Sequence, residues 1–144
     1  MGDGPTEAHV AKLCSNFLIA TVIESLGEAF TLAEKNGLPP QALYDALTEF
    51  LFNCLIYKGY GAHILSGKHD EPLFRLRLGL KDLNLVAQTA FESETPMPLV
   101  SLLKDRYTSS KALGRGDWDW TAVALEIRRQ AGLPPVSKTD EGDG

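Results

Sequence analysis

The sequence predicts one all-α domain, a helical bundle built around one long central helix. Three observations lead to this fold class. Apolar residues recur at helical spacing through most of the 144 residues. Glycine and proline stand between these stretches, where helices commonly end and begin. No stretch shows the alternation of β-branched and polar residues between hairpin turns that is typical of β-sheets.

The first and longest helix is expected over residues 7–36. It contains good helix formers and no proline, and Gly27 is its one weak point. Thr6 is placed to cap its start and Gly37 to end it. Its apolar residues cover much more than one stripe, so we expect this helix to be wrapped by others or by a partner subunit. Its length also suggests a shared dimer core.

Five shorter helices are expected to follow, bounded by proline, glycine or aspartate. Pro40 opens the second helix, and Gly67 ends the third. Asp117 or Asp119 caps the last helix, and residues 132–135 stop it with glycine and proline. The expected ranges of the first four are 40–50, 52–65, 73–93 and 98–114. The last helix is expected to begin after Asp117 or Asp119 and to end at about residue 131.

The domain is expected over residues 6–133, with residues 1–5 and the polar tail 134–144 disordered. The net charge of −5 and the absence of a basic cluster argue against nucleic acid as a partner. No stretch of about 18 apolar residues is free of charge, so no membrane span is expected. The start has no secretory signal, which favours a cytoplasmic location. Cys14 and Cys54 lie in apolar runs, and we expect buried, reduced thiols.

Two pairs of polar residues on separate helices, each containing a lysine, give the main indication of a functional site. Lys12 and Asn16 lie one turn apart and share a helix face. Lys81 and Asp82 point about 100° apart, so Lys81 could reach a ligand while Asp82 anchors another helix. A lysine in a partly dry cleft can donate a proton to a carbonyl oxygen, since burial lowers its pKa. Position alone favours the alternative, in which Lys12 is a surface lysine and Lys81 and Asp82 are solvated charges on an exposed face.

Other polar and aromatic residues give weaker indications. His9, His63 and His69 lack ligand spacing with any cysteine or carboxylate cluster, so no metal site is expected. Trp118 and Trp120 are expected to clamp the last helix onto the bundle. The sequence contains neither a P-loop nor the nucleophile motif of the α/β-hydrolases.

Taken together, these residues resemble the C-terminal helical domain of the β-hydroxyacid dehydrogenase family, the group of 3-hydroxyisobutyrate dehydrogenase and tartronate semialdehyde reductase. The fold implied is like that of the C-terminal domain of 6-phosphogluconate dehydrogenase. The resemblance runs from about residue 8 to 133. Its motifs are Lys12-x-x-x-Asn16, Gly27-Glu28-Ala29-Phe30, the run from Ala33 to Leu38, Phe74, Leu80-Lys81-Asp82-Leu83 and Pro96-Met97-Pro98-Leu99.

The resemblance implies a role for each residue of the two pairs. Lys12 matches the catalytic lysine, which protonates the substrate oxygen as hydride reaches the carbonyl carbon. Asn16 matches the amide that orients the substrate. Lys81 matches a lysine beside the nicotinamide cofactor, NAD or NADP, and Phe74 an aromatic that lines the same cleft. Asp82 is expected to give structural support. The implied substrate is a small hydroxy acid or its semialdehyde.

The sequence matches only the C-terminal half of the family's pattern, and the N-terminal half has no counterpart in it. Family members begin with a Rossmann domain, whose glycine-rich turn holds the dinucleotide at a helix N-terminus. The sequence has no such motif, so we predict that the chain alone is inactive. It would need a Rossmann domain in cis or in trans, and it would self-associate as a dimer or larger assembly. The alternative is a free-standing all-α dimerisation or binding module without catalysis.

Overall fold

The computed structural model describes residues 6–136, so the expected disorder of residues 1–5 and 137–144 lies outside the described residues. Residues 134–136 follow the last helix without forming another. The described part contains six α-helices and no β-strand, as the sequence predicts. The helices are α1 (Glu7–Lys35), α2 (Pro40–Glu49), α3 (Leu55–Ser66), α4 (Leu76–Glu92), α5 (Pro98–Ser110) and α6 (Val123–Gln130).

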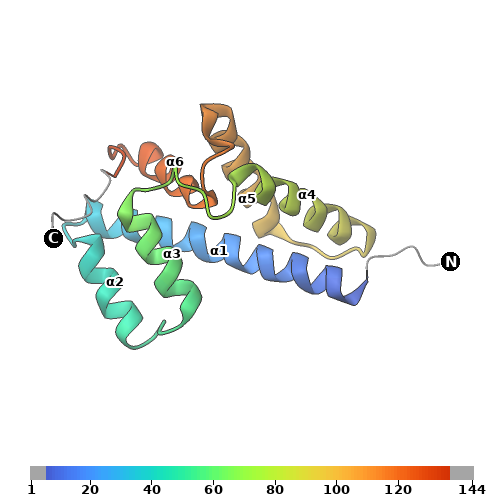
Figure 1. Ribbon diagram of the computed structural model, residues 1–144, viewed down its shortest axis with the longest axis horizontal. Helices are drawn as coiled ribbons and strands as arrows, with labels where there is room; N and C mark the ends of the chain where they lie inside the picture. Colours follow the sequence, from blue (N-terminus) through green and yellow to red (C-terminus); the bar gives the residue numbers. More distant parts are fainter. Residues whose placement is uncertain (1–5, 137–144) are drawn as a thin grey trace.

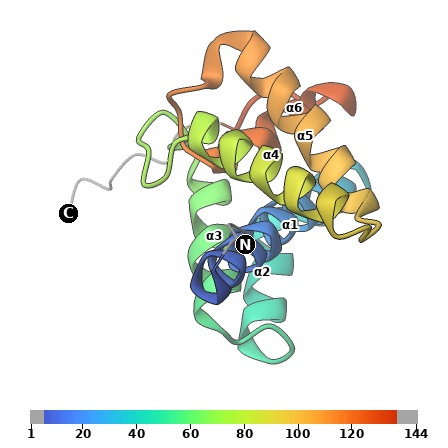
Figure 2. The same cartoon turned by 90° about the vertical axis from the view of Figure 1, so that its right-hand side faces the viewer.

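α1 is the central element, and each of the other five helices packs against it. In Figure 1, α4 lies along the N-terminal half of α1, whereas α2, α3 and α6 gather around its C-terminal half. Figure 2, viewed nearly along α1, shows α2 and α3 on one side of it and α4, α5 and α6 on the other. The two halves of α1 therefore have different surroundings, and the N-terminal half has fewer neighbours.

The ends of α1 and α3 follow the expected capping residues. Thr6 Oγ1 accepts a hydrogen bond from the backbone N–H of His9 at 3.2 Å, which satisfies one free donor of the first turn. Gly37 and Gly67 follow α1 and α3 with φ of 82° and 72°. Glycine adopts this left-handed conformation without the penalty that a Cβ brings.

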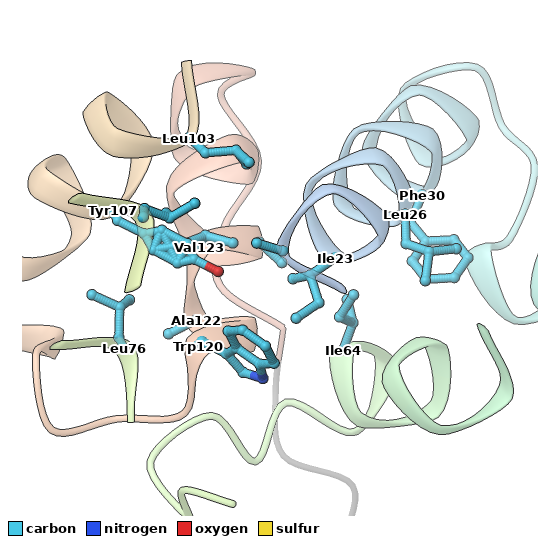
Figure 3. Packing of buried hydrophobic residues seen from close by; sticks show 13 residues of the cluster. Ile23, Leu26, Phe30, Ile64, Leu76, Leu103, Tyr107, Trp120, Ala122 and Val123 are labelled. Atoms are coloured by element: carbon cyan, nitrogen blue, oxygen red, sulfur yellow. The ribbon is translucent and has the colours of Figure 1, made fainter. Parts of the chain in front are cut away.

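The main core lies where α1 meets α3, α5 and the segment that leads into α6. Figure 3 shows that this core is built from side chains of elements far apart in sequence. Its buried members are Ala20, Ile23, Leu26, Phe30, Ile64, Leu76, Leu83, Leu103, Tyr107, Trp120, Ala122, Val123 and Ala124. Trp120 and the partly buried Trp118 both pack here, as expected for residues that clamp the last helix.

Three helix boundaries differ from the sequence-based expectation. α3 begins at Leu55 because Cys54 is extended (φ −143°, ψ 162°). α4 begins at Leu76 because residues 73–75 lie alongside residues 118–120 instead of continuing the helix. α5 ends at Ser110, and a wider π-helical turn carries the chain to 115. The last helix is preceded by a 3₁₀ turn over 120–122, which Asp119 caps.

The expectation of buried cysteines is wrong, since Cys14 and Cys54 are free and exposed. At the level of Cys14, α1 packs through the neighbouring Leu13, which is buried with Val86 and Val100. The next residue points about 100° away from that contact and faces outward. Cys54 lies between α2 and α3, where Leu51 is also exposed.

α1 is long and apolar enough to cross a membrane by length and composition alone, although charged residues led us to expect no such helix. The central helix of a soluble protein passes the same test. Because five helices pack against α1, its apolar residues have partners within the bundle. This feature therefore does not indicate a membrane span.

Candidate functional site

The two lysine-containing motifs of the sequence, Lys12-x-x-x-Asn16 and Lys81-Asp82, meet between α1 and α4. Asn16 Nδ2 donates a hydrogen bond of 2.8 Å to Asp82 Oδ2, and both side chains are half-buried. One turn away, Leu13 and Val86 belong to the same buried cluster. Because the residue numbers rise along α1 as they fall along α4, the two helices run antiparallel here. Asp82 therefore contacts another helix and does not pair with Lys81, as the helix geometry predicts.

The two lysines belong to the helices that this contact joins, Lys12 to α1 and Lys81 to α4, and we call the exposed surface of Lys12, Asn16, Lys81 and Phe74 the open face. Lys12 and Lys81 are exposed, and neither forms an ion pair within residues 6–136. Within residues 6–136, Lys12 is therefore an exposed side chain and not one enclosed in a dry cleft. The N-terminal half of α1 has too few neighbours to enclose the ammonium group.

A narrow crevice lies beneath Asn16 and Asp82, and it has no space for a water molecule. Its remaining lining residues are Phe17, Ala20, Gly79, Leu83, Val86 and Trp120. The candidate site is thus an open face above a closely packed floor. A ligand bound there would need a second wall from outside the described residues.

Phe74 lies at the end of this face where α4 begins. Its half-buried ring packs on the indole of Trp120, with ring centroids 4.5 Å apart and planes inclined by 59°. Gly79 makes room for this pair, because a Cβ there would lie 3.2 Å from Trp120 Cε3 and 3.7 Å from the ring of Phe74. The Phe74 ring is therefore held against Trp120 on one side, and part of it is exposed to solvent.

Asp119 is a functional candidate that the sequence analysis recognised only as a helix cap. Its carboxylate is 1% exposed and accepts hydrogen bonds from the backbone N–H groups of Leu73 (2.9 Å) and Phe74 (3.0 Å). It also accepts from the N–H and the hydroxyl of Thr121, at 3.0 and 2.7 Å. The two bonds from Thr121 form the helix cap. The bonds from Leu73 and Phe74 reach across 46 and 45 residues of sequence, and no local sequence pattern indicates them.

His69 is buried next to this carboxylate. Its Nδ1 lies 2.9 Å from Thr121 Oγ1, and burial lowers its pKa from 6.5 to about 4. His63 lies closer to the surface, with Nε2 3.8 Å from Asp119 Oδ2. Among residues 6–136, no three His, Cys, Asp or Glu side chains are grouped so as to hold a metal ion. The histidines therefore belong to the support of the loop before α4.

A buried ion pair fixes α5 against α1 about two turns beyond Asn16. Arg106 Nε donates to Glu24 Oε1 at 3.0 Å, and Glu24 is 4% exposed. Burial raises the pKa of the Glu24 carboxyl from 4.5 to about 7, against the opposing influence of Arg106. Glu28, the next exposed acid on α1, adds to the increase. This pair belongs to the framework of the bundle and not to the open face.

The residues of the open face suit one part of a dinucleotide and substrate site. The ammonium groups of Lys12 and Lys81 can bind carboxylate or phosphate oxygens, and Phe74 offers an aromatic surface. Asn16 offers the amide groups that Asp82 leaves unused. The described residues contain no strand, and hence no strand–glycine turn–helix unit for a pyrophosphate. They fit one wall of such a site.

Comparison with known proteins identifies the family. Residues 6–127 match the family model described as the NAD-binding domain of NADP-dependent 3-hydroxyisobutyrate dehydrogenase. An uncharacterized oxidoreductase of Bacillus subtilis, YfjR, is 33% identical over 128 residues, which cover 89% of this chain and 44% of that protein. L-threonate dehydrogenase of Cupriavidus necator is 31% identical over 112 residues, 78% of this chain and 37% of that enzyme.

A solved structure gives the same result for the fold. 3-Hydroxyisobutyrate dehydrogenase from Salmonella typhimurium superimposes with a TM-score of 0.77 at 30% identity, over 86% of this chain and 43% of that chain. The chain thus spans less than half the length of the relatives it matches. Its all-α fold is that of their helical domain. The chain belongs to the family of NAD-binding domains of NADP-dependent 3-hydroxyisobutyrate dehydrogenase.

Proposed function

We propose that this chain forms one wall of the active site of an NAD(P)-dependent oxidoreductase that acts on a small hydroxy acid or its semialdehyde. The observation that supports this most strongly is the hydrogen bond between Asn16 and Asp82. It joins two of the motifs that carry the family resemblance, and so brings the Lys12 helix beside the Lys81 helix. A domain that had lost its catalytic function would have no need to keep both motifs in contact.

Lys12 acts as the proton donor and acceptor in this proposal. The nicotinamide cofactor, when bound, supplies or accepts the hydride. The Lys12 ammonium donates a proton to the substrate oxygen during reduction and takes it back during oxidation. Its exposed position leaves it accessible to a substrate held above α1 and α4. Lys81 contributes a second cation to the same face, where it binds the anionic part of the cofactor or substrate.

Asn16 orients the substrate, and Asp82 orients Asn16. With one N–H bound to Asp82 Oδ2, the amide of Asn16 cannot rotate freely. Its Oδ1 and second N–H remain available for a substrate hydroxyl or carbonyl group. Asp82 thereby has the supporting role that the family resemblance implies. Phe74 lines the cofactor side of the face.

The proposal requires a Rossmann domain, in cis or in trans, to close the site over this face. Two observations support that requirement. Lys12 and Lys81 are exposed, and the described residues offer no phosphate-binding turn. We also propose that the chain self-associates, since Leu18 and Leu32 leave apolar surface on α1 exposed. A cytoplasmic location completes this proposal.

The test compares the chain alone with the enzyme in which it is joined or mixed with a Rossmann domain. We expect no sustained NADH or NADPH oxidation by the chain alone, and turnover with a semialdehyde by the assembled enzyme. Lys12→Ala should then lower kcat by about a hundredfold or more. The matched control is Lys58→Ala, which changes an exposed lysine on α3. Turnover by the chain alone would refute the need for a second domain, and equal effects of the two substitutions would refute the role of Lys12.

A free-standing dimerisation or binding module remains the alternative, and the turn between α2 and α3 favours it. Phe50, Leu51 and Leu55 are 75%, 81% and 85% exposed there. Exposed apolar groups of this size often mark a contact surface. The alternative predicts that Lys12→Ala changes nothing measurable, whereas Leu51→Ser weakens self-association in sedimentation experiments. The two proposals are thus separated by different substitutions.

A further inference from the structure

The segment that carries Phe74 is held by a second segment far along the chain. Residues 73–76 run beside residues 118–120 in opposite directions, with an isolated bridge between Arg75 and Asp119. Four backbone hydrogen bonds join this region: Asp119 N–H to His69 O (2.7 Å), Trp120 N–H to Phe74 O (2.9 Å), Leu76 N–H to Trp118 O (2.8 Å) and Arg77 N–H to Gly116 O (2.9 Å). The backbone on both sides of Phe74 is therefore fixed from outside its own helix.

The Asp119 carboxylate adds a side-chain anchor to this contact. Oδ1 accepts from the N–H groups of Leu73 and Phe74, while Oδ2 accepts from the N–H and hydroxyl of Thr121. Both oxygens thus face donors, and the residue is 1% exposed. A carboxylate satisfies all four bonds because it is an acceptor at both atoms. An amide of the same shape would place an NH₂ group against donors on one side.

The position of the Phe74 ring follows from this anchor. Asp119 fixes the Phe74 backbone, and the next residue, Trp120, provides the indole on which the ring packs at 4.5 Å. On the α4 side, Gly79 leaves space that a Cβ would fill. One short stretch of chain, 119–120, therefore sets both the backbone and one face of the ring.

We infer that Asp119 is a positioning residue, which holds Phe74 in place as the aromatic wall of the dinucleotide site. The anchoring of the loop stands on the structure alone. The link to the dinucleotide rests on the proposed function. Asp119 itself is enclosed beneath the loop and touches neither substrate nor cofactor.

The anchoring is tested in this chain by amide hydrogen exchange in the Asp119→Asn variant. We expect the Leu73 and Phe74 amides to exchange about tenfold faster, because the charged acceptor is replaced by a neutral amide that accepts at only one of its two atoms. The Leu76 amide, bound to Trp118 O, reports general loosening and should change less. Asp117→Asn is the matched control, because Asp117 is an exposed neighbour whose side chain, among residues 6–136, bonds only to Arg77.

Equal acceleration at Leu73, Phe74 and Leu76 would overturn the anchoring. If Asp119→Asn does not fold, the unmodified chain still decides the matter. The Leu73 and Phe74 amides must then exchange as slowly as that of Leu76, and fast exchange at either would overturn the inference.

The link to the dinucleotide is tested by a double-mutant cycle in the enzyme that includes the Rossmann domain. Phe74→Ala and Asp119→Asn should each raise the KM for NADH or NADPH about fivefold, with kcat nearly unchanged. The double variant should be no worse than Phe74→Ala, because Asp119 acts through Phe74. Additive effects would overturn the positioning role.

The outcomes separate this inference from the proposed function. If Phe74→Ala leaves KM unchanged, Phe74 is not part of a dinucleotide site, and the functional half of the inference fails with that part of the proposal. If Phe74→Ala raises KM and Asp119→Asn does not, the proposed site stands and the inference fails.

Discussion

Asn16 and Asp82 are 66 residues apart in sequence, yet Asn16 Nδ2 and Asp82 Oδ2 are 2.8 Å apart across the contact of α1 and α4. This bond couples the orientation of an amide on the open face to a carboxylate at its floor. Whatever binds beside Lys12 meets an Asn16 side chain with one of its two N–H groups already in use. The pair therefore links the packing of the bundle to the chemistry of the face.

The first prediction concerns this pair. In the assembled enzyme, Asp82→Ala should raise the substrate KM and lower kcat, because Asn16 loses the bond that orients it. The chain should also lose about 1 kcal/mol of unfolding free energy. Asp82→Asn should have an intermediate effect, since its carbonyl oxygen can still accept the bond. Asn84→Ala, an exposed change on α4, is the control, and an equal effect from it would contradict the prediction.

The second prediction concerns the pH dependence that Glu24 contributes to stability. Burial raises the pKa of Glu24 from 4.5 to about 7, so the folded chain binds a proton there that the unfolded chain has released. Between pH 4.5 and about 7 this contribution to the unfolding free energy falls as pH rises. Glu24→Gln should remove the decline, as measured by urea unfolding at several pH values. If Glu24→Gln leaves the pH dependence of the unfolding free energy unchanged, the raised pKa of Glu24 is contradicted.

The third prediction concerns His69, whose contribution has the opposite sign. Burial lowers its pKa from 6.5 to about 4, so the folded chain keeps it neutral where the unfolded chain takes up a proton. Stability from this group is present above pH 6.5 and is lost as pH falls toward 4. In Glu24→Gln, where the opposing effect is removed, stability should fall visibly below pH 6.5. The double variant with His69→Gln should be flatter in that range, and a persistent slope would point to another group.

The fourth prediction compares two glycines of α3. A Cβ at Gly59 meets nothing within 4 Å, so Gly59→Ala should stabilise the chain by about 0.5–1 kcal/mol through helix propensity. A Cβ at Gly61 would lie 2.7 Å from the Tyr44 ring, whose hydroxyl is bonded to Lys58 O at 2.8 Å. Because that bond holds the ring in place, Gly61→Ala should destabilise by about 1–3 kcal/mol. Thermal unfolding of the two variants checks the opposite signs.

The sequence predicts those parts of the fold that depend on neighbouring residues. α1 is correct almost to the residue because Thr6, Gly37 and an uninterrupted helical pattern lie within one stretch. The start of α4 is wrong because Asp119 determines it from more than forty residues away. A pattern of apolar residues gives the period of a helix, but not which neighbour covers each side. For that reason Cys14 was expected to be buried and is exposed.

The candidate site divides in the same way. Lys12 and Asn16 are visible as a pair because they lie one turn apart on one helix. Helix geometry also indicates that Asp82 faces a different partner from Lys81, but only the packing of α4 on α1 identifies Asn16 as that partner. Lys12 is exposed among the described residues, and nothing there tests the proton-donor role that the family resemblance implies. The roles of these residues stay predictions.

The placement of α1 has a consequence for how the chain is made. Two of its side-chain bonds to later helices, Asn16–Asp82 and Glu24–Arg106, span 66 and 82 residues. During translation α1 therefore emerges well before α4, α5 and α6, the helices that complete its surroundings. Until those helices follow, its apolar residues have no native cover, and nascent chains at this stage are the ones most prone to aggregate. Slow translation between α3 and α5 should thus lower the yield of soluble chain more than slow translation after α6.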